Sequence, residues 1–517
     1  MDLKINRETV PAAQVIFDGV QEQTVELDYI LPDYYPDIFR LIRCQTIPVV
    51  TGYSVSGDKL SYELRCDIHI LYCGEGDSVL RCVTQRQNFS RTVDLGTVCD
   101  SPEISLRPKT DHINFRAVNK RRLDVRGAVS VMIRVSCEKE QEVISDAFGM
   151  NIQVKKIPVR YASKKISLDK NVRISEETEL SPAQPPILGI ISCISKAADC
   201  EKKMISGKLL AKGDVSIELL YACEKDGKGA AQPMKFSLPY SQIIDIDDID
   251  ETFECNIIPT VLSCDITPTS GKTGENTILK CEIELRLMCR AVRTSTVMLA
   301  ADAYSTIYPC ETSVSDIKTE QQPVIYSESR SLTAKIAEGD SVPETIYAMW
   351  CSPKNINTRP GSDGKSVTVS GMLTWSMAAM DSSGMMIMPD RDEAFEETLE
   401  LGEDITGCVI SADVNSGEVS YNISSEGVLT AKTGIDIRLS VSSCTAISAL
   451  TELSVDDSVK KERDGDYSIK LYFGGANEEI WDIAKRYSTS AAAVMEENEL
   501  DGERLKDGGM LLIPIIN

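Results

Sequence analysis

The sequence predicts a mainly β protein: three tandem antiparallel repeats, each a β-sandwich or open barrel, and then a small domain with the element order βααβ. Residues 60–72 alternate between apolar and polar side chains, which is the period of a strand with one face in a core. The same alternation returns at residues 209–221 and 367–379. A unit of ~150 residues is too long for a solenoid repeat, so each copy is expected to bury its own core.

The opening segment of each copy places a proline eight residues before a cysteine. These pairs are Pro36 and Cys44, Pro185 and Cys193, and Pro343 and Cys351. Proline is tolerated in the first turn of a helix, and Ile38, Leu41 and Ile42 would then share one helical face. We therefore expect a short helix at the start of each copy.

Two further strands are predicted in each copy. The shorter strand carries an aromatic residue, at Phe89, Tyr240 and Phe395. The closing strand alternates again, at residues 123–135, 279–289 and 429–441. Because one face of each strand is apolar and the other polar, the pattern favours antiparallel sheets that face water on one side.

An Asp-Ala-aromatic echo follows the closing strands of the first two copies. It reads Asp146-Ala-Phe148 and then Asp302-Ala-Tyr304. With these repeats the chain divides into the following predicted parts: repeats at 1–160, 161–318 and 319–455, an acidic linker at 456–465, and a final domain at 466–517.

The charge balance excludes several classes of partner. The 517 residues include 55 Lys or Arg and 79 Asp or Glu, a net charge of −24, which would repel nucleic acid and anionic lipid. The first residues show no basic segment followed by an apolar run, and no stretch of ~18 apolar residues occurs. We expect a soluble chain without a signal peptide and without membrane insertion.

The cysteines and histidines give no reason to expect a metal, another cofactor or catalysis. Seventeen cysteines is an odd number, so reduced, buried thiols are expected, with Cys66, Cys281 and Cys289 on the apolar faces of strands. There is no C-x-x-C pair, and the two histidines, His69 and His112, lie in no catalytic motif. The sequence therefore predicts a protein that is not an enzyme.

The final domain resembles a LysM domain, whose anchors recur here in order and at suitable spacing. The matching residues are Tyr467, Ile469, Trp481, Ile483, Ala484, Tyr487, Asn498, Gly509, Leu512, Ile513 and Pro514. The resemblance implies a groove between the turn after the first strand and the loop before the last. The candidate partner-binding residues are Gly475, Ala476, Asn477, Glu478, Glu479, Trp481, Asn498, Leu500 and Gly509.

The three copies resemble SPOCS domains, which commonly open with a Pro-Asp-Ile segment and close on an Arg-Arg-x-Leu strand. Repeat 1 supplies Pro36-Asp-Ile-Phe-Arg-Leu-Ile42 and Arg121-Arg-Leu-Asp-Val125. Repeat 2 supplies the aromatic-Ser segment Tyr240-Ser-Gln-Ile-Ile but lacks the arginine pair, and repeat 3 is the most divergent. SPOCS repeats followed by one LysM domain are the architecture of SipL-like spore morphogenetic proteins.

This resemblance implies a non-enzymatic scaffold in endospore coat assembly. It would bind the coat-basement morphogenetic ATPase and other coat proteins, partly through the LysM domain, and would lie in the mother-cell cytoplasm at the forespore surface. The alternative is a cell-wall or cortex protein whose LysM domain binds the N-acetylglucosamine polymer of peptidoglycan. The turn Gly475-Ala-Asn-Glu-Glu-Ile480 replaces the usual Gly-Asp-Thr-Leu of the family, which argues against the glycan ligand.

Overall fold

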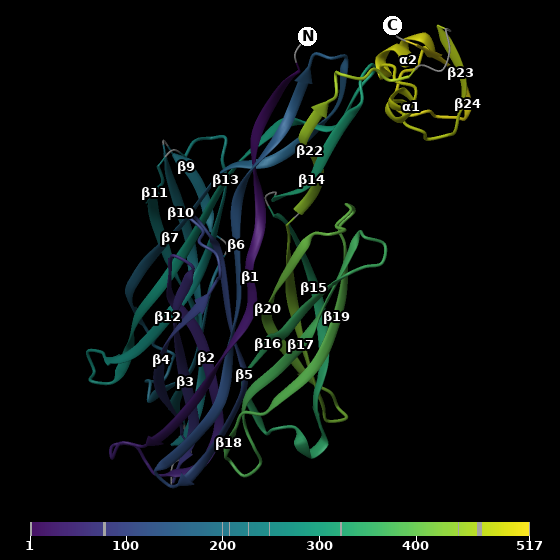
Figure 1. Ribbon diagram of the computed structural model, residues 1–517. Coiled ribbons are helices and arrows are strands. Elements are labelled where there is room, and N and C mark those ends of the chain that lie inside the picture. The colour runs from purple at the N-terminus through teal and green to yellow at the C-terminus, as the bar shows by residue number, and fades with distance from the viewer. Residues whose placement is uncertain are drawn as a thin grey trace.

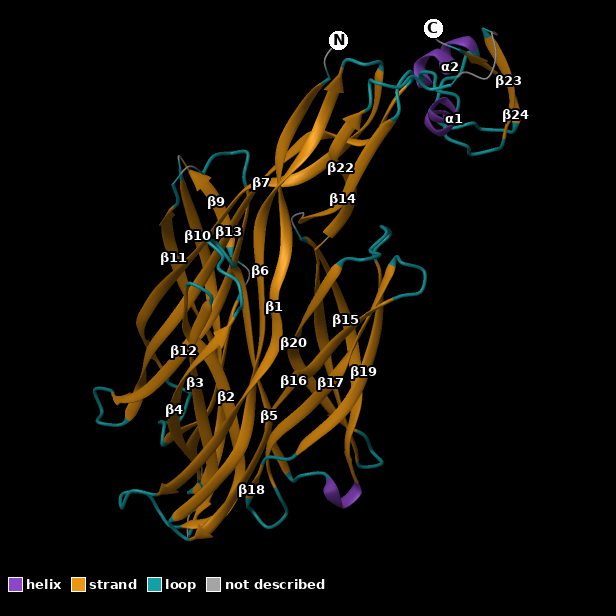
Figure 2. Ribbon diagram, in the orientation of Figure 1, coloured by secondary structure: helices purple, strands orange, loops and turns teal. Residues whose placement is uncertain are grey.

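The computed structural model describes residues 3–75, 79–198, 200–205, 207–225, 227–247, 249–320, 323–442, 444–462 and 468–515. The protein is mainly β, as predicted, with 74% of the described residues in the strands of small antiparallel sheets and two short helices near the C-terminus. Figure 1 shows an elongated body of strands, and Figure 2 shows that the two helices are confined to a lobe at one end. Both chain ends lie at that end of the body.

Repeat 1 is a sandwich of two three-stranded sheets. The first sheet has the order β1-β6-β5, with β1 (Lys4–Ile30), β6 (Arg122–Phe148) and β5 (Glu103–Asn119). The second has the order β2-β3-β4, with β2 (Ile38–Ser56), β3 (Lys59–Gly74) and β4 (Leu80–Asp94). The two sheets share one core because the inward positions of the central strands β3 and β6 meet in a single cluster.

Repeat 2 has the same plan. One sheet has the order β12-β13-β7, with β12 (Glu254–Ser270), β13 (Asn276–Ser305) and β7 (Ile152–Glu179). The other has the order β11-β10-β8, with β11 (Lys228–Asp245), β10 (Lys208–Lys225) and β8 (Gly189–Ala197), and β9 (Glu201–Ile205) also pairs with β10. Gly213 in β10 leaves room for the side chain of Tyr240 on β11, because a Cβ at this position would lie 2.7 Å from the Tyr240 hydroxyl oxygen.

Repeat 3 follows the plan with shorter strands. One sheet has the order β15-β21-β20, with β15 (Val324–Glu338), β21 (Val428–Ser442) and β20 (Val409–Ile423). In the other, β17 (Ser366–Met380) pairs with β16 (Thr345–Pro360), β18 (Met386–Ile387) and β19 (Asp390–Glu400). A 3₁₀ turn, η1 (Gly339–Ser341), follows β15. A separate two-stranded ribbon is formed by β14 (Cys310–Glu320) and β22 (Cys444–Val455).

The predicted alternating strands are confirmed, and they are the central strands of their sheets. Residues 60–72, 209–221 and 367–379 lie in β3, β10 and β17. The closing segments lie in β6, β13 and β21. A central strand is covered on one face along its whole length, which is why its alternation is regular.

The predicted helices at the start of each copy are wrong, because these segments are the edge strands β2, β8 and β16. In the opening part of β2 the pairing with β3 skips Phe39 and Ile42, so two of the three bulges of this strand interrupt the register there. A bulge adds one residue and shifts the phase of the side chains. This shift turns the period of two into spacings of three for the core-facing Ile38, Leu41 and Cys44, which the sequence alone does not distinguish from a helical face.

A three-ribbon junction joins the repeats at the end of the body that holds the chain ends (Figure 1). The ribbons are formed by β1 with β6, by β7 with β13, and by β14 with β22. The inward residues of one layer are Val10 and Val143, Val159 and Leu299, and Ile317 and Ala449. The next layer contains Ile144, Ala147, Ala300, Ala303, Leu450 and Leu453. Each ribbon therefore contributes equivalent positions to both apolar clusters.

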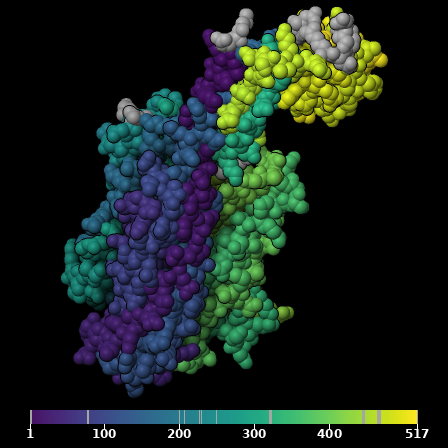
Figure 3. All heavy atoms as spheres, viewed as in Figure 1, coloured from purple at the N-terminus to yellow at the C-terminus, as the bar shows by residue number. Residues whose placement is uncertain are grey.

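The C-terminal module has the predicted βααβ order, with β23 (Ile469–Gly474), α1 (Ile480–Arg486), α2 (Ala491–Glu497) and β24 (Gly509–Pro514). The two strands pair antiparallel, and the helices pack on one face of the pair. The predicted anchor Tyr467 and linker residues 463–465 lie outside the described residues. Figure 3 shows the module as a lobe that stands beside the end of the body.

The cysteines are mainly free thiols, with one disulfide that the sequence did not predict. Cys66, Cys281 and Cys289 are buried, and burial raises the pKa of each thiol to about 11. Cys99 and Cys137 form a disulfide, so the expectation that all thiols are reduced is wrong for this pair. Burial protects Cys66, Cys281 and Cys289, because it disfavours the thiolate, which is the reactive form.

Leu299→Ala is expected to destabilise the junction, because Leu299 is 0% exposed between the three ribbons. Loss of a buried leucine side chain costs about 2–5 kcal/mol of unfolding free energy. Urea denaturation followed by circular dichroism measures the change. The control is Met298→Ala on the same strand, where the side chain is 46% exposed and the cost should stay below about 0.5 kcal/mol. Equal costs for the two variants would contradict the importance of the junction.

Candidate binding site

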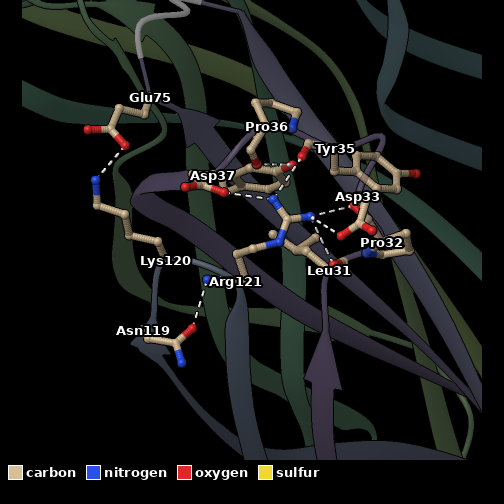
Figure 4. A network of polar contacts seen from close by, with 11 residues as sticks. Leu31, Pro32, Asp33, Tyr35, Pro36, Asp37, Glu75, Asn119, Lys120 and Arg121 are labelled. Atoms are coloured by element: carbon tan, nitrogen blue, oxygen red, sulfur yellow. Dashed lines mark hydrogen bonds and ion pairs between the residues drawn. The ribbon is translucent and has the colours of Figure 1, made fainter.

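The two segments that carry the SPOCS resemblance in repeat 1 contact each other through Arg121 (Figure 4). The Arg121 guanidinium donates to the Asp37 carboxylate at 2.6 Å and to the carbonyl oxygens of Leu31 at 3.1 Å and Pro32 at 2.7 Å. These contacts fasten the loop before β2 to the start of β6. The arginine is therefore a structural residue, as expected for a guanidinium whose donors match carboxylate and carbonyl acceptors.

Repeat 2 keeps the backbone part of this contact without the arginine. The Leu31 N–H donates to the Arg121 carbonyl at 2.8 Å, and the Leu180 N–H donates to the Thr277 carbonyl at the same distance. Thr277 thus stands where repeat 1 has Arg121. The loop geometry that repeats 1 and 2 share comes from the backbone hydrogen bond. The guanidinium stabilises the loop in repeat 1 and has no counterpart in repeat 2.

The turn after β23 and the loop before β24 lie side by side, as the LysM resemblance implies. The Asn477 N–H donates to the Leu505 carbonyl at 2.8 Å, and the Leu505 N–H donates to the Glu478 carbonyl at 3.0 Å. The exposed members of the predicted site at this edge are Gly475, Ala476 and Asn477, with the half-buried Gly509 beside them. The structure brings these four residues together.

Three other predicted site residues support the module's own fold. The Glu478 carboxylate accepts hydrogen bonds from the Tyr472 hydroxyl at 2.7 Å and from a backbone N–H of the turn at 3.0 Å; the tyrosine bond is the main cause of the lowered pKa of Glu478. The Asn498 side chain joins α2 to β24 through two hydrogen bonds of 2.7 Å with the Leu512 backbone. Leu500 packs against the module's core.

Trp481, the largest of the predicted site residues, contacts repeat 2 instead of a groove. Its indole N–H donates to the Asp302 carboxylate at 2.8 Å, and the Lys485 ammonium donates to the same carboxylate at 2.7 Å. The Trp481 ring meets the Tyr304 ring edge to face, with centroids 4.9 Å apart. Helix α1 is thereby docked on the end of β13.

The C-terminal module docks at the second of the two Asp-Ala-aromatic motifs, the one that contains Asp302 and Tyr304. Tyr304 is 2% exposed under the module, and its hydroxyl donates to the Thr489 carbonyl at 2.7 Å. This burial raises the pKa of Tyr304. In the first echo Phe148 is 52% exposed. One of two equivalent positions on the junction is therefore covered by the module, and the other is open.

Glu479, the last predicted site residue, forms an ion pair across the same interface. Its carboxylate contacts Lys155 on β7 and Arg504 in the loop before β24. The hydrogen bond from Lys155 is the main cause of the lowered pKa of Glu479. A lowered carboxyl pKa stabilises the docked state above the ordinary pKa of glutamate, and this contribution is lost as the pH falls through the lowered value.

An apolar face of the β23–β24 pair is the feature that sequence reasoning missed. Its exposed side chains are Ile469 (47%), Leu471 (62%), Phe473 (73%), Met510 (68%) and Leu512 (36%). They alternate with Lys470 and Tyr472, which face the helices and lie against Tyr487. The module thus turns the apolar side of its first strand outward. The alternation itself was visible in the sequence, but its direction was not.

Within the described residues, no three His, Cys, Asp or Glu side chains come together as a metal site. None of the helices that the structure describes is both long and apolar enough to span a bilayer. The fold defines a tandem β-sandwich protein with a docked C-terminal βααβ module.

The comparisons with known proteins place one part of this chain in a family. Residues 186–269 match the family model described as SipL, SPOCS domain. This segment runs from the loop before β8 through most of β12 in repeat 2. No curated protein and no solved structure matches the chain. The chain therefore carries a SipL/SPOCS domain in repeat 2, and this domain suggests a protein of the sporulation coat.

Asp302→Ala is expected to release the C-terminal module, because the carboxylate accepts hydrogen bonds from both Trp481 and Lys485. Loss of a charged acceptor costs about 1.5–3 kcal/mol, so cleavage between repeat 3 and the module should speed up about tenfold or more in limited proteolysis. The control is Asp146→Ala, at the same position of the first echo, where the carboxylate contacts Lys156 and not the module. Unchanged cleavage of the Asp302 variant would contradict the docking.

Proposed function

We propose that this protein is a non-enzymatic scaffold of endospore coat assembly, which binds the coat-basement morphogenetic ATPase and other coat proteins at the forespore surface. The observation that carries the proposal is the SPOCS domain at residues 186–269, because SPOCS-domain proteins are spore morphogenetic and generally non-catalytic. The strand plan of this segment recurs in repeats 1 and 3. We extend the SPOCS assignment to those two repeats on this ground.

The C-terminal module supports the proposal as a LysM-like adaptor. Its βααβ order, its two paired strands and its helices follow the LysM pattern. The apolar face defined by Ile469, Leu471, Phe473, Met510 and Leu512 is the partner-binding surface that we propose. Exposed apolar patches rimmed by polar residues mark protein–protein contacts, and a few residues, often aromatic ones, provide most of the contact energy.

The neighbouring turn completes this surface. Gly475, Ala476 and Asn477 are exposed next to Phe473, so a partner that covers the apolar face also reaches the turn. Trp481 and Glu479 act from the other side, where they hold the module on repeat 2. The module is thereby presented to a partner by a rigid body, which reduces the entropy lost on binding.

Phe473→Glu in the full chain is expected to weaken capture of the purified coat-basement ATPase about tenfold or more, because a carboxylate would be buried in an apolar interface. A pull-down with quantified bound fractions measures the loss. The matched control is Phe148→Glu, an equally bulky exposed phenylalanine outside the module, which should keep capture within about twofold.

Three results would contradict this proposal. The first is undiminished capture by the Phe473 variant and by a chain without the module. The second is capture that is lost equally in the Phe148 control. The third is co-sedimentation of the full chain with purified peptidoglycan. If the Phe473 substitution leaves this co-sedimentation unchanged and a soluble N-acetylglucosamine oligomer abolishes it, a glycan-binding module is favoured.

A further inference from the structure

A large cavity of about 3350 Å³ lies between the three repeats and is lined by all of them. The strands that contribute most of its wall are β2 and β5 of repeat 1, β8 and β12 of repeat 2, and β16 and β20 of repeat 3. Each of these six strands is an edge strand of its sheet. The junction therefore arranges the open edges of the three sandwiches around one shared space.

The charge of this cavity is opposite to that of the whole chain. The lining residues include thirteen Lys or Arg and seven Asp or Glu, in a protein with a net charge of −24. Outside the lining, acidic residues outnumber basic ones by thirty. A basic interior within an acidic exterior attracts an anionic segment into the cavity and repels large polyanions from the rest of the surface.

Several of the lining cations are available to a ligand. Arg107 on β5, Arg290 on β13 and Lys354 on β16 are exposed, and none of them makes an ion pair or a side-chain hydrogen bond with any described residue. They come from the three different repeats. By contrast, Arg43 already pairs with Asp390 at 3.2 Å, which shows that some lining cations serve to join repeats.

Apolar side chains are interspersed with these cations. Ile47 and Met132 of repeat 1, Ile258 of repeat 2 and Ile325 of repeat 3 line the cavity and are each about 40% exposed. Such positions favour a ligand that carries apolar groups as well as negative charge. An inorganic anion or a free nucleotide would leave them unused.

The lining strands also offer backbone hydrogen bonds. Among the described residues, β2, β12, β16 and β20 each pair with a neighbouring strand along one side alone, and residues of all four strands line the cavity. An edge strand can accept an added strand from another polypeptide, with main-chain bonds providing affinity and side chains providing specificity. A nucleic acid lacks the backbone to make this ladder.

We propose that the central cavity binds an extended acidic segment of another protein, in which acidic and apolar side chains alternate, by strand addition to one of these edges. The acidic side chains would contact Arg107, Arg290 and Lys354, and the apolar side chains would contact Ile258 and Ile325. This site is separate from the C-terminal module. It can therefore fail or succeed independently of the proposed ATPase contact.

The probe is a fluorescein-labelled peptide of about twelve residues in which glutamate alternates with valine and threonine, long enough to span ~40 Å as a strand. Fluorescence anisotropy with the full chain measures binding. We expect saturable binding that weakens as salt rises, because the contacts are electrostatic. The same peptide with lysine in place of glutamate should not bind, and a version with prolines at alternate positions should bind about tenfold more weakly, because its N–H donors are lost.

The variant that tests the site is the triple substitution Arg107→Glu, Arg290→Glu and Lys354→Glu, with one change in each repeat. It should weaken the glutamate peptide at least about tenfold. The matched control is Lys59→Glu, Lys272→Glu and Lys432→Glu, which changes three exposed lysines outside the cavity and adds the same charge. The control should bind the peptide within about twofold of the unchanged chain.

Three outcomes would overturn the proposal. One is equal weakening by both triple variants, which would indicate a general charge effect. Another is tighter binding of a twelve-nucleotide polythymidine than of the glutamate peptide, which would favour a nucleic acid. The last is the absence of any anisotropy change with a chain whose circular dichroism is that of a folded protein. Hydrogen exchange that slows on the lining edge strands with the peptide present would confirm strand addition.

Discussion

The packing of three β-ribbons into one apolar junction is the constraint on which the rest of the structure depends. In repeats 1 and 2 the ribbon is the extension of the first and last strands of the sandwich, so the orientation of the ribbon also fixes the orientation of the sandwich, whereas the β14–β22 ribbon is a separate pair of strands. Small residues such as Ala147, Ala300 and Ala449 let the ribbons approach closely. The shared cavity and the position of the module both follow from this packing.

The fold could be predicted from the sequence wherever a strand is buried on one face along its length. Leu60, Tyr62 and Leu64 alternate regularly because β3 is a central strand. The edge strands could not be assigned, because bulges such as those at Phe39 and Ile42 shift the phase and imitate a helix. The one sequence feature that marks the junction is the repeated Asp-Ala-aromatic motif at Asp146 and Asp302. The role of this motif depends on contacts between residues far apart in sequence, so the sequence alone does not reveal it.

The candidate site was predicted in part. The turn at residues 475–477 lies at an exposed edge, as the family resemblance implies, but Trp481 and Glu479 contact repeat 2. This contact could not be foreseen, because Tyr304, a residue of another repeat, completes the core of the module. With the helices held between Tyr304 and the two strands, the outer side of β23 is left uncovered, and its apolar residues become a surface.

The pairing of first with last strands has a consequence for biosynthesis. Lys4 pairs with Phe148, so the sheet of repeat 1 that contains β1 cannot close until nearly the whole repeat has been translated. At ribosomal rates this leaves β1 without its partner for roughly 7–30 s, and contacts of such long sequence separation also form slowly. Nascent chains of this protein therefore pass through a period in which long strands have no hydrogen-bonded partner strand. Holdase chaperones that cover such strands during this period would raise the yield of native protein.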